Sequence, residues 1–208
     1  MNLFFIKKYK NMTSISEIYN KMLANGTNDF ERVGWGSIES QEKRFHVLTE
    51  IGDLENTSVL DVGCGLGAYY DHINKIFSNI VYTGLDINPN MIQAARKRLP
   101  NIEFMHVDLV SDKHVLNNRK FDYVFLSGAL NLSADRHGDM IKDLMRIMFS
   151  LANKGVAINF LSVFSDYLTP GEYYCNPADL LQIAFSLTKK VTLRHDYMSH
   201  DFTIYLYK

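Results

Sequence analysis

The sequence contains 208 residues, of which 47% are hydrophobic and 22% are charged, as in soluble globular proteins. The formal net charge is −1, which gives no electrostatic footprint for DNA or RNA, so we expect no nucleic-acid partner. Two cysteines and seven scattered histidines show neither a disulfide framework nor metal-ligand spacing. No segment approaches the roughly 18 apolar residues of a membrane span. We expect a cytoplasmic protein without membrane or metal, which starts at Met1 or Met12.

The N-terminal quarter of the sequence predicts helices and no strands. Apolar residues recur at helical spacing over residues 13–24, with Thr13 or Ser14 as the cap, and again over residues 38–51. The segment between them, residues 29–37, fits neither helical nor strand periodicity and is predicted to be an irregular loop. Residues 1–54 are therefore expected to form a helical lid beside the rest of the chain.

From residue 55 onwards, strand patterns alternate with helix patterns. Strands are predicted over residues 58–62, 80–85, 102–107, 121–126 and 155–161, and helices over residues 67–77, 89–98, 111–117 and 137–152. Such alternation indicates a parallel sheet with helices on both faces. Near the end, a helix over residues 177–187 precedes two strands, 191–197 and 202–207, that predict an antiparallel hairpin. Residues 55–208 thus predict an α/β core, which forms a single domain with the lid.

A glycine-rich turn after the first predicted strand is the most informative feature of the chain. Residues 59–67 read V-L-D-V-G-C-G-L-G, in which Gly63, Gly65 and Gly67 follow the acidic Asp61. Glycines let the backbone turn sharply and approach a ligand without a Cβ clash. A strand, such a turn and a helix start form the nucleotide cradle of open α/β sheets. The turn predicts a nucleotide-like ligand, although glycine turns are common.

Three more strand ends carry residues that suit a nucleoside. The second strand ends at Asp86, which can accept hydrogen bonds from ribose hydroxyls. The third ends in Asp108-Leu109, an acceptor and an apolar wall that suit an adenine ring. The fourth runs into residues 127–131. Ligands of such sheets lie outside the carboxyl ends of the strands, so we expect these side chains to converge.

The D-x-G-C-G-x-G turn, the acidic end of strand two, the Asp-Leu pair and the F-D-x-V strand four resemble the class I S-adenosylmethionine-dependent methyltransferases. The resemblance implies a Rossmann-like, doubly wound, mostly parallel sheet with an antiparallel C-terminal hairpin strand, and S-adenosyl-L-methionine as cofactor. It implies that the cofactor contacts Asp61, Gly63, Cys64, Gly65, Asp86, Ile87, Met91, Asp108, Leu109 and Ser127, joined by Arg44. A nicotinamide dinucleotide fits less well, because its G-x-G-x-x-G pattern places the third glycine one residue later.

Candidate acceptor contacts come from the lid and from the loops beyond strands four and five. They are Tyr19, Arg32, Trp35, Asn131 and Tyr173. Trp35 is either a ligand contact or a buried anchor, and Tyr173 belongs either to the lid or to the core. Arg44 meets the cofactor carboxylate, the substrate or a surface acid. Asn131, which can orient an acceptor, and His137, which can act as a base, are the candidate catalytic residues, with a turn or helix-start role as the alternative.

The resemblance implies methyl transfer, and the small size of the chain favours a small-molecule acceptor. A protein or tRNA methyltransferase and a non-catalytic S-adenosylmethionine-binding protein are the alternatives. No motif identifies the acceptor atom, a general base or the oligomeric state.

Overall fold

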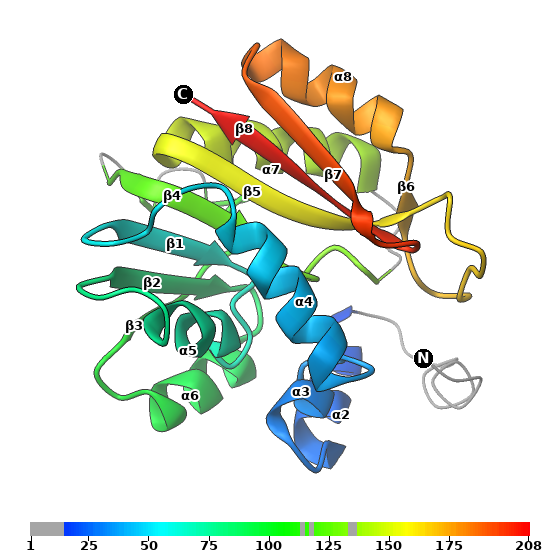
Figure 1. Cartoon of the computed structure of the whole chain (residues 1–208). Coiled ribbons are helices and arrows are strands. Elements are labelled where there is room, and N and C mark those ends of the chain that lie inside the picture. The colour runs from blue at the N-terminus through cyan, green and yellow to red at the C-terminus, as the bar shows by residue number, and fades with distance from the viewer. Residues whose placement is uncertain (1–14, 113–114, 117–118, 133–136) are drawn as a thin grey trace.

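The structure, a computed structural model, describes residues 15–112, 115–116, 119–132 and 137–208. Its centre is an eight-stranded sheet in the order β3-β2-β1-β4-β5-β8-β7, with β6 paired to β5 (Figure 1). The strands are β1 Ser58–Val62, β2 Val81–Asp86, β3 Glu103–His106, β4 Phe121–Leu126, β5 Ala152–Ser162, β6 Tyr174–Cys175, β7 Val191–Met198 and β8 Asp201–Tyr207. All pairings among the first six strands are parallel, as alternation of strands and helices requires.

Helices cover both faces of this sheet. They are α2 Ile15–Asn25, α3 Asp29–Arg32, α4 Ile38–Thr49, α5 Ala68–Asn74, α6 Pro89–Arg98, α7 His137–Leu151 and α8 Pro177–Leu187. One core cluster joins α7 and α8 to residues such as Leu60 and Val124, and a second joins α4, α5 and α6 to residues such as Val59 and Phe125. Adjacent residues of β1 and β4 thus face opposite cores, which explains why apolar residues occupy consecutive positions in both strands. The expected Rossmann-like α/β architecture is confirmed.

The sheet reverses its order at β1. This strand pairs in parallel with β2, where Asp61 lies opposite Gly84, and with β4, where Asp61 lies opposite Phe125. The chain leaves β1 and β4 towards opposite faces, so a crevice forms outside their carboxyl ends. In Figure 1 the arrowheads of β1 and β2 point towards α2, α3 and α4, which lie beside this edge.

The predicted C-terminal hairpin is confirmed. β8 runs antiparallel to β5 from the Gly155–Tyr207 pair to the Leu161–Asp201 pair, and β7 pairs antiparallel with β8. β5 begins at Ala152, three residues before the predicted start. The two-residue strand β6 was not predicted, because so short a segment shows no alternation.

Two element predictions differ from the structure. The first part of the predicted loop 29–37 is the helix α3, which begins after Asn28, whose side chain accepts a hydrogen bond from the Glu31 amide at 3.0 Å. A four-residue helix is too short to show periodicity, and its cap is its only sequence signature. The helix predicted over residues 111–117 is wrong for its described residues, which form turns and irregular structure. The proposed caps Thr13 and Ser14 lie outside the described residues.

None of the helices in the described ranges is long and apolar enough to span a bilayer.

Candidate active site

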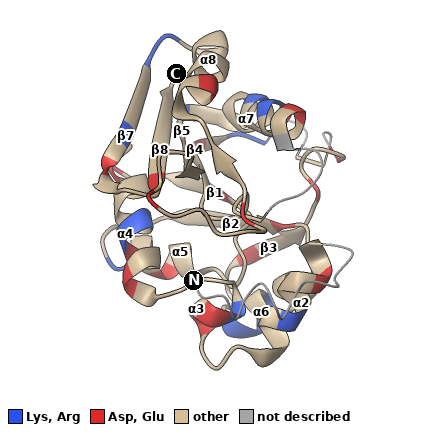
Figure 2. Ribbon diagram, turned by 90° about the vertical axis from the view of Figure 1, so that its right-hand side faces the viewer, with Lys and Arg blue, Asp and Glu red and all other residues tan. Residues whose placement is uncertain are grey.

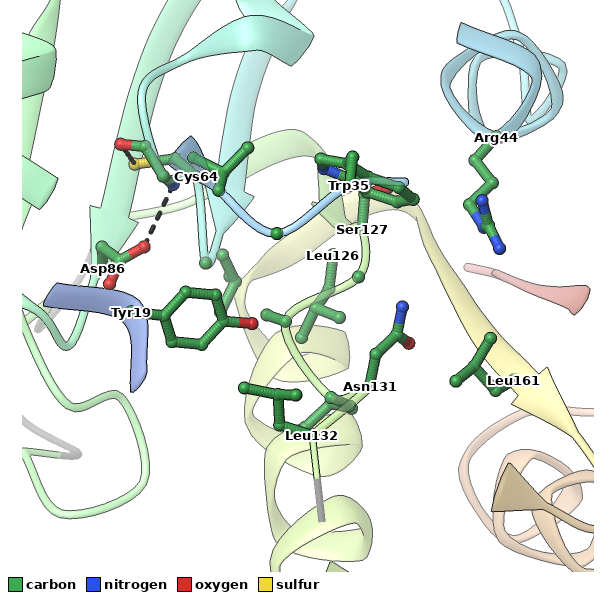
Figure 3. Close-up of a pocket in the computed structure, with 18 of the residues that line it drawn as sticks. Tyr19, Trp35, Arg44, Cys64, Asp86, Leu126, Ser127, Asn131, Leu132 and Leu161 are labelled. Atoms are coloured by element: carbon green, nitrogen blue, oxygen red, sulfur yellow. Dashed lines mark hydrogen bonds between the residues drawn. The ribbon is translucent and has the colours of Figure 1, made fainter. Parts of the chain in front are cut away.

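A cavity of about 560 Å³ lies at the carboxyl ends of β1, β2 and β4. Its walls come from the glycine turn after β1, the ends of β2 and β4, the lid helices α2 and α4, and the loop between β5 and β6 (Figure 3). Every residue predicted to contact the cofactor lines it, and so do Tyr19, Trp35 and Asn131. The crevice that the strand order predicts is therefore a single cavity, which is lined both by the predicted cofactor contacts and by three of the predicted acceptor contacts.

The glycine turn has the backbone that its sequence predicts. Gly63, Gly65 and Gly67 have φ angles of 74°, 53° and 81°, in the left-handed region that favours glycine. A Cβ at Gly63 would lie 2.4 Å from the Cβ of Ala129, in the loop after β4. The amides of Gly63 and Cys64 both donate to the Leu85 carbonyl, at 2.8 and 2.9 Å. The turn is thus fixed between β2 and the β4 loop, with its backbone along the cavity.

Asp61 is a buried carboxylate beside this turn. It is 3% exposed, and the Tyr82 hydroxyl donates a hydrogen bond to its Oδ2. Burial raises the pKa of Asp61 to about 7, with the Tyr82 hydrogen bond opposing this shift and the charge of Asp86 adding to it. Because burial destabilises the ionised form of Asp61, a positively charged ligand beside it would stabilise that form.

Asp86, the last residue of β2, binds the backbone of the glycine turn. Its Oδ2 accepts a hydrogen bond from the Gly65 amide at 3.0 Å (Figure 3). Its Oδ1 accepts one from the Asn88 amide at 2.8 Å. Burial raises the pKa of Asp86, and the two amide hydrogen bonds oppose that shift. Asp86 therefore orders the backbone of the cradle as well as offering lone pairs to a ligand.

The end of β3 supplies a polar edge and apolar walls. Asp108 accepts hydrogen bonds from the Val110 amide at 3.0 Å and from the Ser111 hydroxyl at 2.7 Å. Partial burial alone would raise the pKa of Asp108, but these hydrogen bonds outweigh burial and hold it below its ordinary value. Leu109 and Met91 are buried and line the same part of the cavity. An ionised acceptor between apolar side chains suits a flat heteroaromatic ring.

The loop after β4 is held in place by Asn159, a buried residue of β5 that sequence reasoning missed. The Asn159 Oδ1 accepts from the Gly128 amide at 2.9 Å, and its Nδ2 donates to the Ser127 hydroxyl at 3.1 Å. A Cβ at Gly128, whose φ is 71°, would lie 2.7 Å from the Trp35 ring. Asn131 lies farther along this loop, and its side chain lies between Ser127 and Leu161 in the view of Figure 3.

The lid brings aromatic side chains to the cavity. Tyr19 of α2 points into the cavity in Figure 3. Burial, and to a lesser extent the negative charge of Asp86, raises the pKa of the Tyr19 hydroxyl. Trp35 forms a wall above Gly128, so it is both a cavity residue and a packing anchor. The side chain of Asn88 donates to the Asn20 Oδ1 at 2.9 Å, which ties α2 to the end of β2. The lid and the cradle are thus joined by hydrogen bonds.

Arg44 lines the cavity, yet its guanidinium is already paired. Its Nε lies 2.5 Å from the Oδ2 of Asp201, and the two side chains are 4% and 1% exposed. The guanidinium carbon also lies 4.9 Å from the centre of the Trp35 ring. Tyr197 donates to the other oxygen of Asp201. One alternative from the sequence was that Arg44 pairs with a surface acid. Arg44 does pair with an acidic side chain, but that side chain, Asp201, is buried.

Two predicted acceptor contacts do not line this cavity. Arg32 turns back to the lid, where its Nε donates to the Leu23 carbonyl at 3.1 Å. Tyr173 packs against the α7–α8 core, and its neighbours Glu172 and Tyr174 line the cavity instead. Alternate residues of an extended segment face opposite sides, so the position of Tyr173 agrees with the core alternative rather than with the lid alternative. His137 begins α7, and its side chain lies outside the described part of the chain.

Within the described ranges, no group of three or more His, Cys, Asp or Glu side chains is placed to hold a metal ion. The buried thiol of Cys64 belongs to the wall of the cradle, and burial raises its pKa.

Comparisons with known proteins agree with this geometry. Residues 59–150 match a family model described as a methyltransferase domain. A Mycobacterium tuberculosis protein named as a methyltransferase is 29% identical over 158 residues, 73% of this chain and 93% of the relative. The malonyl-[acyl-carrier protein] O-methyltransferase of Acetivibrio thermocellus is 27% identical over 192 residues, and the match covers 76% of this chain and 65% of that enzyme.

A solved structure shares the fold. Magnesium protoporphyrin IX methyltransferase from Synechocystis PCC 6803, with bound S-adenosylhomocysteine, superposes with a TM-score of 0.65 at 16% identity, over 93% of this chain and 98% of that one. At this identity the match concerns the architecture alone, whereas the similarity to methyltransferases in sequence rests on the family model and the relatives. The matched segment 59–150 begins in β1 and carries the glycine turn, Asp86 and Asp108, so these cradle residues lie within the part of the chain that matches a methyltransferase domain.

Proposed function

We propose that the protein transfers a methyl group from S-adenosylmethionine to a small-molecule acceptor held in the same cavity. The observation that carries this proposal is the continuity of the cavity, which runs from the glycine turn to the β5–β6 loop. Its volume of about 560 Å³ lies within the usual range for small-molecule sites, roughly 300–1,000 Å³. The lid residues Tyr19 and Trp35 contribute to its walls, which favours an enclosed acceptor over a macromolecular surface.

The residues of the cradle fit the cofactor. Asp61 offers a buried negative charge to a cation, and Asp86 and Asp108 offer acceptors to the ribose hydroxyls and the adenine amino group. The cofactor supplies the electrophile: the acceptor's lone pair bonds to the methyl carbon while the carbon–sulfur bond breaks and leaves its electron pair on sulfur. Proximity and alignment are the main contributions of the protein to such a step. Asn131 lines the same cavity, and we infer that it orients the acceptor.

The charge distribution supports a small acceptor. Among the described residues, the Lys and Arg positions along the ribbon in Figure 2 are spread over several elements, α4, α6, α7 and β7 among them, rather than gathered in one stripe. Binding of a tRNA requires neutralisation of several phosphates, and the net charge of −1 does not provide it.

S-adenosylmethionine and S-adenosylhomocysteine, but not NAD, are expected to raise the melting temperature. At a concentration of about 100 times the dissociation constant, the stabilisation is about 2.7 kcal/mol. The measurement is a thermal scan with each ligand at matched concentration. A shift with NAD and none with either sulfur compound would contradict the assignment of the cradle.

The acceptor class is tested with labelled cofactor. The protein is incubated with methyl-labelled S-adenosylmethionine and a size-fractionated extract of its own cells. Label in the low-molecular-weight fraction supports the proposal. Label confined to RNA or protein would contradict it and would mean that the lid is a docking surface.

Substitution of Asp86 by Ala is expected to weaken S-adenosylhomocysteine binding about ten- to a hundredfold, because charge-assisted hydrogen bonds of roughly 1.5–3 kcal/mol are lost. The melting temperature should also fall, since the amides of Gly65 and Asn88 lose their acceptor. Calorimetric titration measures the affinity, with Asp143→Asn, an exposed carboxylate on α7, as the control. Unchanged affinity in Asp86→Ala would place the ribose elsewhere.

A further inference from the structure

The part of the cavity lined by the lid, the β4 loop and the β5–β6 loop has its own composition. Its walls include apolar side chains of the lid, the β4 loop and β5, among them Trp35, Leu132 and Leu161. Two carboxylates of the β5–β6 loop, Asp166 and Glu172, line it as well. We call this region the acceptor end. It combines an apolar body with negative charge.

No free positive charge balances these carboxylates within the described part of the chain. Arg44 is the one Lys or Arg among the described lining residues, and its charge is paired with the buried Asp201. His200 also lines the cavity, but partial burial and the nearby guanidinium of Arg44 lower its pKa, so its ring is neutral near pH 7. The acceptor end therefore has a net negative charge.

Glu172 is the better positioned of the two carboxylates. It is partly buried, whereas Asp166 is exposed. The Tyr174 hydroxyl donates to its Oε2 at 2.6 Å and accepts from the Thr169 amide at 2.9 Å, which holds the side chain in place. The Oε1 of Glu172 accepts no hydrogen bond from any residue that the structure describes, which leaves it available to a ligand. A fixed carboxylate with an available oxygen at an apolar wall is suited to bind an ammonium group.

We propose that the acceptor is an amine with an apolar body, and that Glu172 determines this specificity by binding the amine's positive charge. The inference rests on the proposed function. Relatives in the comparisons are named for acids, such as trans-aconitate and fatty acid. A carboxylate at this acceptor end would meet Glu172 and Asp166 without a free cation among the described residues, and like charges disfavour binding. For transfer, a bound ammonium gives one proton to water, and the freed nitrogen lone pair forms the bond to the methyl carbon as the carbon–sulfur electron pair moves to sulfur.

The test uses three probes that share a phenylethyl body: 2-phenylethylamine, 2-phenylethanol and 3-phenylpropanoate. Each is titrated calorimetrically into the protein saturated with S-adenosylhomocysteine. The amine is expected to bind at least about tenfold more tightly than the carboxylate, with the alcohol between them. Glu172→Gln, which keeps the shape of the side chain, should reduce this ratio about tenfold, whereas Asp143→Asn on the outer face of α7 should leave it unchanged.

A second measurement does not depend on a variant. When salt is raised from about 0.05 to about 0.5 M, the affinity of the amine should fall several-fold and that of the alcohol should stay constant, because screening acts on the charged pair alone. Equal or tighter binding of the carboxylate, or an amine preference that survives both Glu172→Gln and salt, would overturn the inference while leaving the proposed function intact. Absence of S-adenosylhomocysteine binding to the wild-type protein would overturn the proposed function, and the inference with it.

Discussion

Replacement of Asp201 by Asn is expected to lower the free energy of unfolding by about 3–5 kcal/mol, because it leaves the Arg44 guanidinium buried without its counter-charge. The Tyr197 hydroxyl keeps an acceptor in the variant, so the charge is the main loss. Urea unfolding of the ligand-free protein measures this change. The pair joins α4 to the start of β8, and its loss should therefore loosen the lid as well as the sheet.

The matched control is the exposed pair between Arg146 and Asp143 on α7, whose side chains are 55% and 43% exposed. Asp143→Asn should cost less than about 1 kcal/mol, because solvent screens an exposed ion pair. If Asp201→Asn costs no more than this control, Arg44 is not held by Asp201, and its charge is available to an anionic ligand. The same experiment therefore tests a premise of the amine specificity.

The sequence could predict the α/β order and the cofactor cradle because both depend on local chemistry. Strands β1 and β4 are recognisable because apolar residues occupy consecutive positions in them, and the turn at Gly63 and Gly65 needs backbone angles that few other residues adopt. Parallel strands place their carboxyl ends at one edge, so Asp86 and Asp108 could be assigned to the same crevice before any distance was known.

The acceptor end could not be predicted in the same way. The contact of Arg44 with Asp201 spans 157 positions, and it depends on the register of β8 against β5. Asn159 supports the β4 loop from a strand whose pattern shows only burial. Whether Tyr173 or its neighbours face the cavity depends on the pairing of β6 with β5, which two residues of strand do not reveal. Long-range pairing, rather than residue type, decides each of these positions.

The ligand-free protein is expected to lose stability between pH 4 and pH 7 through Asp61. The ordinary pKa of the side chain is 3.8, and burial raises it to about 7 in the folded chain. In that window the folded state holds a proton that the unfolded state has released. The contribution of Asp61 to stability is therefore fully present below the pKa of the unfolded state, and it is lost as the pH rises through the pKa of the folded state. Asp61→Asn removes this titration and keeps an acceptor for the Tyr82 hydroxyl. The melting temperature of the variant relative to wild type should therefore rise with pH.

Cofactor affinity should change in the opposite direction, because the ionised form of Asp61 binds the positive charge of S-adenosylmethionine. Between pH 5.5 and 7.5 the affinity of the wild-type protein is expected to rise about twentyfold, by proton linkage to a group of pKa about 7. Asp61→Asn should bind at least about thirtyfold more weakly at pH 7.5, with little dependence on pH, since one partner of a buried charge pair is absent. Calorimetric titrations at several pH values measure both effects, and Asp143→Asn should follow the wild-type curve. A flat wild-type profile would show that Asp61 is already ionised in the free protein, and an equally steep profile in Asp61→Asn would assign the proton to another group. Increased stability together with weakened binding in the same variant would show that the fold keeps a destabilising buried carboxylate at this position because the cofactor needs its charge.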